Sequence, residues 1–168
     1  HTASKGAVYF DGDADYINCP ESFYDTNIEG EFTYMAWFKP SDLSAAVYPS
    51  GGGSLHFFRI DSTSAVSFRL EGTDNAFTGL DTINANAWTH IAITRNSADL
   101  MTVYINGAAQ TDTETCADKH FAMRWIGTHT GSSNFYKGWI DEFMIYSKAL
   151  TAAEVSKNYK YSASKHTN

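Results

Sequence analysis

The amino-acid sequence predicts an all-β domain, a sandwich or jelly roll of antiparallel strands with one short helix near the C-terminus. Two observations support this fold class: apolar and polar residues alternate with period two in many short segments, and Gly, Asn, Asp and Ser fill the gaps between them. The 168 residues suit one domain with one core. We expect residues 1–168 to form a single domain, with an ordered core over about 5–161 and a polar, frayed tail over 162–168.

The N-terminal part is expected to contribute three strands. Residues 7–10 and 16–19 flank the acidic segment 11–15, which predicts a hairpin with an acidic turn. Residues 32–39 are rich in aromatic side chains and stop at Pro40, which cannot donate to a sheet ladder.

The rest of the chain repeats this pattern and ends in a helix. Asn106-Gly107 is the dipeptide preferred in tight hairpin turns, and it follows a strand at 100–105. Thr151 and Glu154 fit a capping box, in which each side chain accepts from the other residue's backbone N–H. Further strands are predicted at 55–60, 65–70, 88–95, 123–127 and 135–146, and a glycine loop at 51–53. The expected sheet interior holds Phe10, Phe32, Trp37, Trp88, Ile91, Phe143 and Ile145.

Composition excludes several kinds of partner. Twelve Lys and Arg against nineteen Asp and Glu give a formal charge of −7, which disfavours a nucleic-acid binder. No apolar run approaches the ~20 residues that cross a bilayer, so we expect no membrane insertion. The two cysteines, Cys19 and Cys116, are either one disulfide or two buried thiols.

Several segments together resemble one family. They are residues 7–12 with 15–17, 32–40, 88–95, 103–107 and 138–146 running into 149–154. In this order and spacing they resemble the laminin-G-like, concanavalin-A-like lectin and glucanase jelly rolls, especially the bacterial type. The resemblance implies two stacked antiparallel sheets and a short helix after the last strand. It also implies a structural calcium ion and a binding role toward a glycan or an extracellular protein.

The calcium ligands implied by the resemblance are Asp141, a carbonyl at Gly30 and oxygens near Asp11. Strand alternation places Asp141 on one face with Trp139, Phe143 and Ile145, where a carboxylate needs a partner. A cation would serve, and oxygen ligands suit Ca²⁺. The alternatives are that Asp141 caps a turn or pairs with a lysine.

Other metal sites are not supported by the sequence. An EF-hand beginning at Asp11 fails because its sixth and twelfth positions are Tyr16 and Ser22. No histidine lies near a cysteine at zinc-ligand spacing, and His90 is expected on a sheet face with a hydrogen bond.

No catalytic constellation is recognisable, so we expect a noncatalytic protein. The adjacent acids Asp141 and Glu142 point to opposite faces of a strand and cannot act as a glycosidase pair. The jelly-roll glucanase pattern Glu-x-Asp-x-x-Glu and the Gly-x-Ser-x-Gly elbow are both missing from the sequence.

Aromatic residues in loops are the best candidates for contacting a sugar, because rings pack against sugar faces and nearby polar groups orient them. The predicted ligand-binding residues are Tyr48, Trp125, His129, Asn134, Phe135 and Tyr136. We therefore expect a monomeric carbohydrate-binding module, extracellular or at the cell surface, within a larger secreted or cell-surface protein. The alternatives are a protein-interaction or structural domain of an adhesin, and a degenerate glycoside hydrolase.

Overall fold

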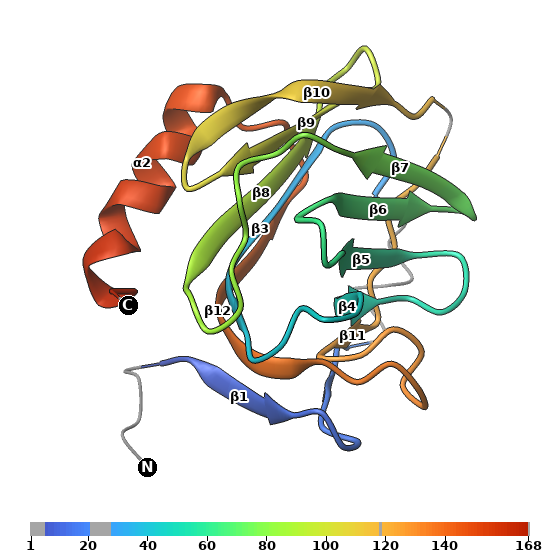
Figure 1. The fold of residues 1–168 in the computed structure, drawn as a ribbon. Coiled ribbons are helices and arrows are strands. Elements are labelled where there is room, and N and C mark those ends of the chain that lie inside the picture. The colour runs from blue at the N-terminus through green and yellow to red at the C-terminus, as the bar shows by residue number, and fades with distance from the viewer. Residues whose placement is uncertain (1–5, 21–27, 118, 168) are drawn as a thin grey trace.

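The computed structural model describes residues 6–20, 28–117 and 119–167, and these form two antiparallel six-stranded sheets stacked face to face (Figure 1). This confirms the predicted jelly-roll sandwich. Sheet A has the order β1-β12-β3-β8-β9-β10. Its strands are β1 (Val8–Asp11), β12 (Lys137–Tyr146), β3 (Phe32–Pro40), β8 (Thr89–Arg95), β9 (Leu100–Ile105) and β10 (Ala108–Thr115).

Sheet B has the order β2-β11-β4-β5-β6-β7. Its strands are β2 (Ile17–Asn18), β11 (Trp125–Ile126), β4 (Val47–Gly51), β5 (Phe57–Ile60), β6 (Val66–Leu70) and β7 (Thr73–Phe77). The chain thus runs repeatedly between the two layers, and residues far apart in sequence meet on one sheet face.

The core lies between the two sheets and is built largely of stacked aromatic rings. The Phe32 ring stacks on Phe68 and Phe121 at centroid distances of 5.7 and 5.2 Å. Tyr34 is fully buried among these rings, and its hydroxyl meets the Ser50 hydroxyl at 2.9 Å. Because alternate strand residues face inward, the other face of each sheet stays free for other contacts.

The helix α2 (Ala152–Ser162) covers the outer face of sheet A, on the side away from sheet B (Figure 1). The predicted capping box of Thr151 and Glu154 begins it. Val155 and Leu150 pack there against Met35 and other outward-facing sheet residues.

The C-terminal tail is not frayed over the described residues, so that prediction is wrong. A 3₁₀ turn, η1 (Ala163–Lys165), follows α2, and both Ser162 and His166 are buried. The Ser162 hydroxyl accepts a hydrogen bond from Trp37 Nε1 at 3.0 Å, which ties the tail to strand β3.

The predicted N-terminal hairpin is also wrong. Strand β1 pairs with β12 in sheet A, while β2 pairs with β11 in sheet B. The acidic segment between them therefore crosses from one sheet to the other. In the sequence, a short acidic segment between two apolar ones looks the same as a hairpin turn. Strands β4, β7 and β10 were not predicted, because they are rich in Gly, Thr, Asp and Ala.

A β-bulge in β12 overturns the predicted alternation around Asp141. The pairing with β3 shifts between Asp141 and Met144, and Glu142 has a φ of 48°. Phe143 and Ile145 consequently pack on the inner core, whereas Asp141 lies opposite Trp37. Trp37 itself faces outward under the C-terminal tail, not into the sheet interior as predicted.

Cys19 and Cys116 are both buried free thiols, so the disulfide alternative does not hold. Burial raises the pKa of the Cys19 thiol above its ordinary value. Among the described residues, no helix has the length and apolar composition needed to span a bilayer.

Candidate functional site

The outer face of sheet B carries a cluster of aromatic and arginine side chains. Strand alternation places Phe57 and Arg59 of β5 and Arg69 of β6 on this face, beside Tyr48 of β4. His129, from the loop after β11, packs onto the same rings. We call these five residues the sheet B face.

The rings of the sheet B face are held in a fixed arrangement. The Tyr48 and His129 rings stack with a centroid distance of 4.8 Å and an interplanar angle of 12°. Phe57 meets His129 edge-on at 5.1 Å, and the Arg69 and Arg59 guanidinium carbons lie 4.9 and 5.5 Å from the Phe57 centroid. Phe57 is thereby almost fully covered, while Tyr48 and His129 stay partly exposed.

The loop over residues 128–135, here the rim loop, positions His129. The Thr128 hydroxyl donates to the Ser133 carbonyl at 2.8 Å, and the Thr130 and Ser133 hydroxyls meet at 2.8 Å. Gly51 lets the loop lie flat on sheet B, because a Cβ there would be 2.1 Å from the His129 carbonyl oxygen. Short polar residues and one glycine therefore preorganise the loop.

Hydrogen bonding defines the tautomer of His129. Asn134 Nδ2 lies 3.2 Å from His129 Nδ1, and an amide nitrogen can only donate. His129 Nδ1 is then the acceptor, so in the neutral ring the hydrogen sits on Nε2, a buried atom with no hydrogen-bond partner among the described residues. Burial, and then the nearby Arg69 cation, lower the pKa of His129 below its ordinary value.

Five of the six predicted ligand-binding residues lie on or beside the rim loop. Tyr48, His129 and Asn134 form one contact group. The Trp125 ring packs under Gly131 and carries the Arg124 guanidinium at 4.9 Å, and Phe135 stacks on Tyr16 at 6.5 Å.

Tyr136 is the exception, and its prediction is wrong. It is fully buried, its ring packs edge-on against Phe10, and its hydroxyl lies 3.4 Å from the Trp139 carbonyl oxygen. A side chain in this position belongs to the core and cannot reach a ligand at the surface.

Sequence reasoning missed Phe57, Arg59 and Arg69. The alternation Phe57-Phe58-Arg59-Ile60 does mark two outward positions on one strand. The sequence of one strand does not indicate which outward-facing residues of other strands lie beside it, because that depends on the strand order of the sheet.

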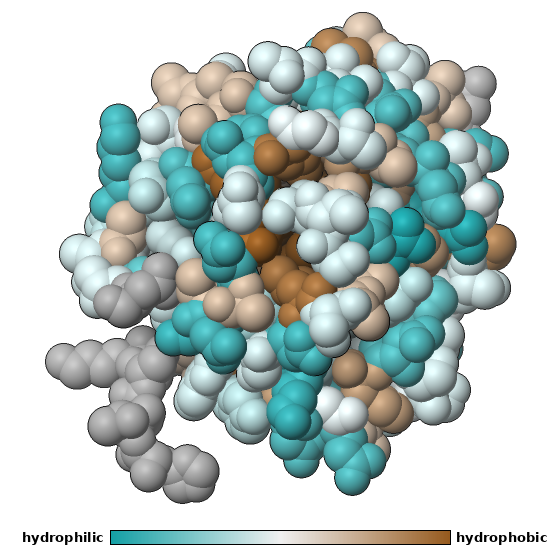
Figure 2. Space-filling view, viewed as in Figure 1, coloured by the Kyte–Doolittle hydropathy of each residue, from teal (hydrophilic) through white to brown (hydrophobic). Residues whose placement is uncertain are grey.

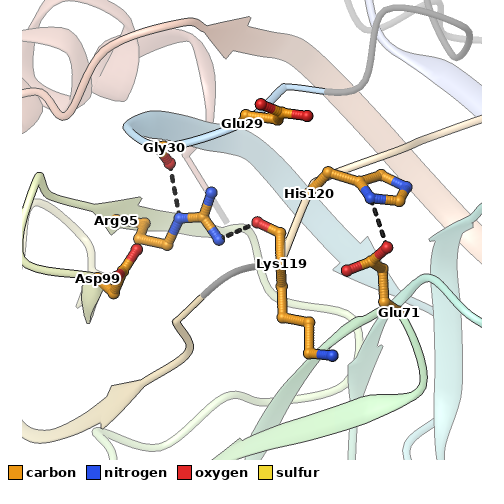
Figure 3. A pocket seen from close by; sticks show the side chains of 7 residues that line it. All are labelled: Glu29, Gly30, Glu71, Arg95, Asp99, Lys119 and His120. Atoms are coloured by element: carbon orange, nitrogen blue, oxygen red, sulfur yellow. Dashed lines mark hydrogen bonds and ion pairs between the residues drawn. The ribbon is translucent and has the colours of Figure 1, made fainter.

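A second feature is a pocket of about 480 Å³ near the strand ends, where β3 begins and β8 ends (Figure 3). It is lined by Glu29, Gly30, Glu71, Arg95, Asp99, Lys119 and His120. We call it the strand-end pocket. Figure 3 shows Arg95 on one side and the pair of His120 and Glu71 on the other, with His120 Nδ1 2.6 Å from Glu71 Oε1.

Arg95 has a structural role in this pocket. It is buried, and its guanidinium donates to the carbonyls of Gly30, Cys116 and Lys119. On the other side, the His56 ring lies 5.0 Å from His120, and burial lowers the pKa of His56 to about 4.

The predicted calcium ligands do not come together. Asp141 pairs with Trp37 in the sheet, and Gly30 lies seven residues before Trp37, which separates the two by roughly 20 Å. Asp11 pairs with Lys137, about 13 Å along β12 from Asp141. The Gly30 carbonyl already accepts from Arg95 at 2.6 Å. The predicted set therefore does not fit a single calcium site, and the described residues hold no cluster of three or more His, Cys, Asp and Glu suited to a metal.

His166 supplies the partner that Asp141 needs. Its Nε2 lies 2.9 Å from Asp141 Oδ2, and its Nδ1 lies 3.0 Å from the Ser162 carbonyl oxygen. Both ring nitrogens of His166 are thus engaged, one by the Asp141 side chain and one by the backbone. The His166 ring stacks on Trp37 with a centroid distance of 4.2 Å and an interplanar angle of 11°. Neither a turn cap alone nor a lysine partner describes this arrangement.

These features define a lectin-like jelly roll with a preorganised aromatic face on one sheet. The chain belongs to the concanavalin A-like lectin/glucanases superfamily, whose family model matches residues 11–156. No curated protein sequence matches the chain.

Solved structures of the same fold include two with a bound saccharide. One is domain 4 of AbnA, an extracellular arabinanase of Geobacillus stearothermophilus, in complex with arabinotriose, at 21% identity and a TM-score of 0.68 over 90% of this chain and 75% of that one. Another is the Ruminococcus gnavus sialidase module CBM40 bound to α2,3 sialyllactose. It has 12% identity and a TM-score of 0.69, over 92% of this chain and 96% of that one.

Other similar structures are longer than this chain. The chain spans 45% of a Bacteroides ovatus protein assigned as carbohydrate binding, at 16% identity and a TM-score of 0.67 over 90% of this chain. Identities this low show a shared fold and nothing finer.

Proposed function

We propose that this domain is a noncatalytic carbohydrate-binding module and that its glycan lies on the sheet B face. The observation that carries this is the fixed Tyr48–His129 ring pair, partly exposed and bordered by arginine and asparagine side chains. Rings of this kind pack on the C–H faces of sugars, while nearby donors and acceptors set the orientation of the hydroxyl groups.

The comparisons support this proposal through the fold. Two similar structures hold arabinotriose and sialyllactose, so the same sandwich accommodates saccharides in other proteins. By analogy with the arabinanase, we place the module within a larger secreted or cell-surface protein, where it would tether that protein to a polysaccharide.

The polarity of the face drawn in Figure 2 favours a glycan over a protein partner there. On the face drawn in Figure 2, polar side chains dominate and strongly apolar ones gather mainly in a narrow strip between the two sheets. At and beside strands β1 and β2, the described residues do expose Val8, Tyr9, Tyr16 and Ile17, each at 42–44%. This edge is where a protein partner would be sought among the described residues, because exposed apolar patches mark interfaces.

A polysaccharide screen tests the proposal. The domain is run through native gels containing soluble polysaccharides, once with calcium and once with EDTA, beside the Tyr48→Ala variant. Retardation of the wild-type domain that Tyr48→Ala abolishes supports the sheet B face. Free migration of a folded sample in every gel would contradict it and favour a protein-interaction domain.

The same screen tests the calcium prediction. Retardation in calcium that EDTA removes would reveal an ion, whose ligands would then lie outside the predicted set. Equal migration in both conditions would argue against calcium in glycan binding.

A further inference from the structure

The arginines of the sheet B face are each neutralised by an acid. Arg69 forms a fork with Asp74, through Nε to Oδ1 and through Nη2 to Oδ2 at 3.0 Å. Arg59 Nε lies 3.2 Å from Asp61 Oδ1. The two guanidinium groups and two carboxylates cancel in formal charge, and all four side chains remain partly exposed, between 26 and 40%.

One further donor of each guanidinium is engaged, and the others stay available to a ligand. Arg69 Nη1 donates to the Ser54 carbonyl at 3.0 Å, and Arg59 Nη2 donates to the Ser67 hydroxyl at 3.1 Å. A sugar carboxylate or sulfate is bound best by a bidentate arginine fork. On Arg69 that fork is already filled by Asp74, so an acidic sugar could use it only by displacing a carboxylate of the protein.

His129, the histidine of the sheet B face, adds no charge at neutral pH. Burial and the two arginines hold the pKa of His129 below its ordinary value, which leaves the ring neutral. The exposed Asn134 side chain then offers dipolar amide groups suited to hydroxyl and ring oxygens. The whole chain carries a formal net charge of −7, so its long-range electrostatic field also opposes the binding of a polyanion.

We infer that the sheet B face binds uncharged glycans and that the Arg59–Asp61 and Arg69–Asp74 pairs exclude acidic ones. This inference rests on the proposed function and narrows its ligand class. The pairs work through competition: each aspartate keeps its guanidinium as a fixed donor for hydroxyl oxygens, and removes it as a binding site for an anion.

Charge-neutralising variants of the aspartates test this inference. Asp74→Asn and Asp61→Asn keep the shape of the side chain but leave the arginine charge unmatched. Asp13→Asn makes the same charge change in the exposed segment between β1 and β2 and serves as the control. Binding is measured on neutral polysaccharides (galactan, arabinan, glucomannan) and on polygalacturonate and alginate, at low salt and at about 0.5 M NaCl.

The wild-type domain is expected to bind a neutral polysaccharide with little salt dependence, and the acidic ones at least tenfold more weakly. Asp74→Asn or Asp61→Asn is expected to gain about tenfold in affinity for the acidic polysaccharides, and to lose that gain in high salt. Asp13→Asn should behave as wild type.

Three outcomes would overturn the inference, and they differ from one another. Tighter, salt-sensitive binding of the acidic polysaccharides by the wild type would leave the proposed function standing and refute the ligand class. Neutral binding without any gain in either folded aspartate variant would refute the role of the ion pairs. If a folded sample binds neither kind, the proposed function falls as well.

Discussion

At the residue scale, the account depends on the pair of Tyr48 and His129. Aromatic contacts of this kind contribute about 0.5–1.5 kcal/mol beyond the area they bury, so each ring is expected to matter individually. The two side chains come from a strand and a loop that are about eighty residues apart in sequence, and they meet only because β11 pairs with β4.

Tyr48→Ala should lower glycan affinity about tenfold, which corresponds to about 1.4 kcal/mol, with little loss of stability. The removed ring is partly exposed and is not part of the inner core. Isothermal titration with the glycan found in the screen measures the change. Tyr161→Ala is the control, because this tyrosine is 82% exposed on α2, away from sheet B. Equal affinity for wild type and Tyr48→Ala would place the site elsewhere.

His90 is a residue whose burial creates an acid sensitivity. Its ring lies under α2, between Trp37 and Tyr159, at 5.3 and 5.9 Å. Burial lowers its pKa to about 4; Glu142 opposes this shift and His166 adds to it. It does lie on a sheet face as predicted, but its Nδ1 has no hydrogen-bond partner among the described residues.

The folded protein holds His90 neutral, whereas the unfolded chain protonates it near its ordinary pKa of 6.5. The resulting stability is present above pH 6.5 and is lost as the pH falls toward 4, by up to about 3 kcal/mol. Urea unfolding at pH 7.5 and 4.5 measures this loss. His90→Phe should reduce the difference between the two pH values, and an unchanged difference would refute the assignment to His90.

At the element scale, the C-terminal tail closes the outer face of sheet A. His166 stacks on Trp37 and pairs with Asp141, so the tail connects β3, β12 and α2. A cation was predicted at Asp141, and the His166 side chain is the partner that the structure places there, from within the chain.

His166→Ala should destabilise the domain by about 2–4 kcal/mol, because it leaves the largely buried Asp141 side chain without its hydrogen-bond partner and removes a buried ring from the Trp37 stack. The midpoint of urea unfolding measures the effect. Lys165→Ala is the matched control, since Lys165 pairs with Glu142 at the exposed surface and its loss should change stability little. Equal losses in the two variants would show that the Asp141–His166 pair has no special weight.

The rim loop depends on the absence of a side chain at position 51. Gly51→Ala should cost about 1–3 kcal/mol and weaken glycan binding, because its Cβ would collide with the His129 backbone. Gly53→Ala is the comparison: it has φ of 87° but open space around it, so only backbone strain of about 1 kcal/mol is expected. Thermal unfolding and titration are run on both. Full glycan affinity in Gly51→Ala would show that the loop position is unimportant for binding.

At the scale of the whole molecule, sequence patterns predicted the layers better than the connections. The aromatic strand β3, the hairpin at Asn106 and the capping box of Thr151 follow from local chemistry, and all are found in the structure. The strand partner of the first segment and the bulge at Glu142 depend on long-range pairing, which local alternation does not encode.

The candidate site, too, could be predicted only in part from the sequence. Loop aromatics such as Tyr48 and His129 could be found from composition and turn signals, but Tyr136 looked equivalent and is core. The arginines of the sheet B face and the histidine beside Asp141 come from distant segments. Only the strand order and the path of the tail bring them into place.

The most direct test of the central claim is to map the bound glycan on the ¹⁵N-labelled domain by chemical-shift perturbation. The account predicts that saturating oligosaccharide shifts the amides of β4, β5 and the rim loop and the Trp125 indole, while those around the strand-end pocket stay in place. Shifts confined to Glu71, Lys119 and His120, or to the outer face of sheet A, would contradict it.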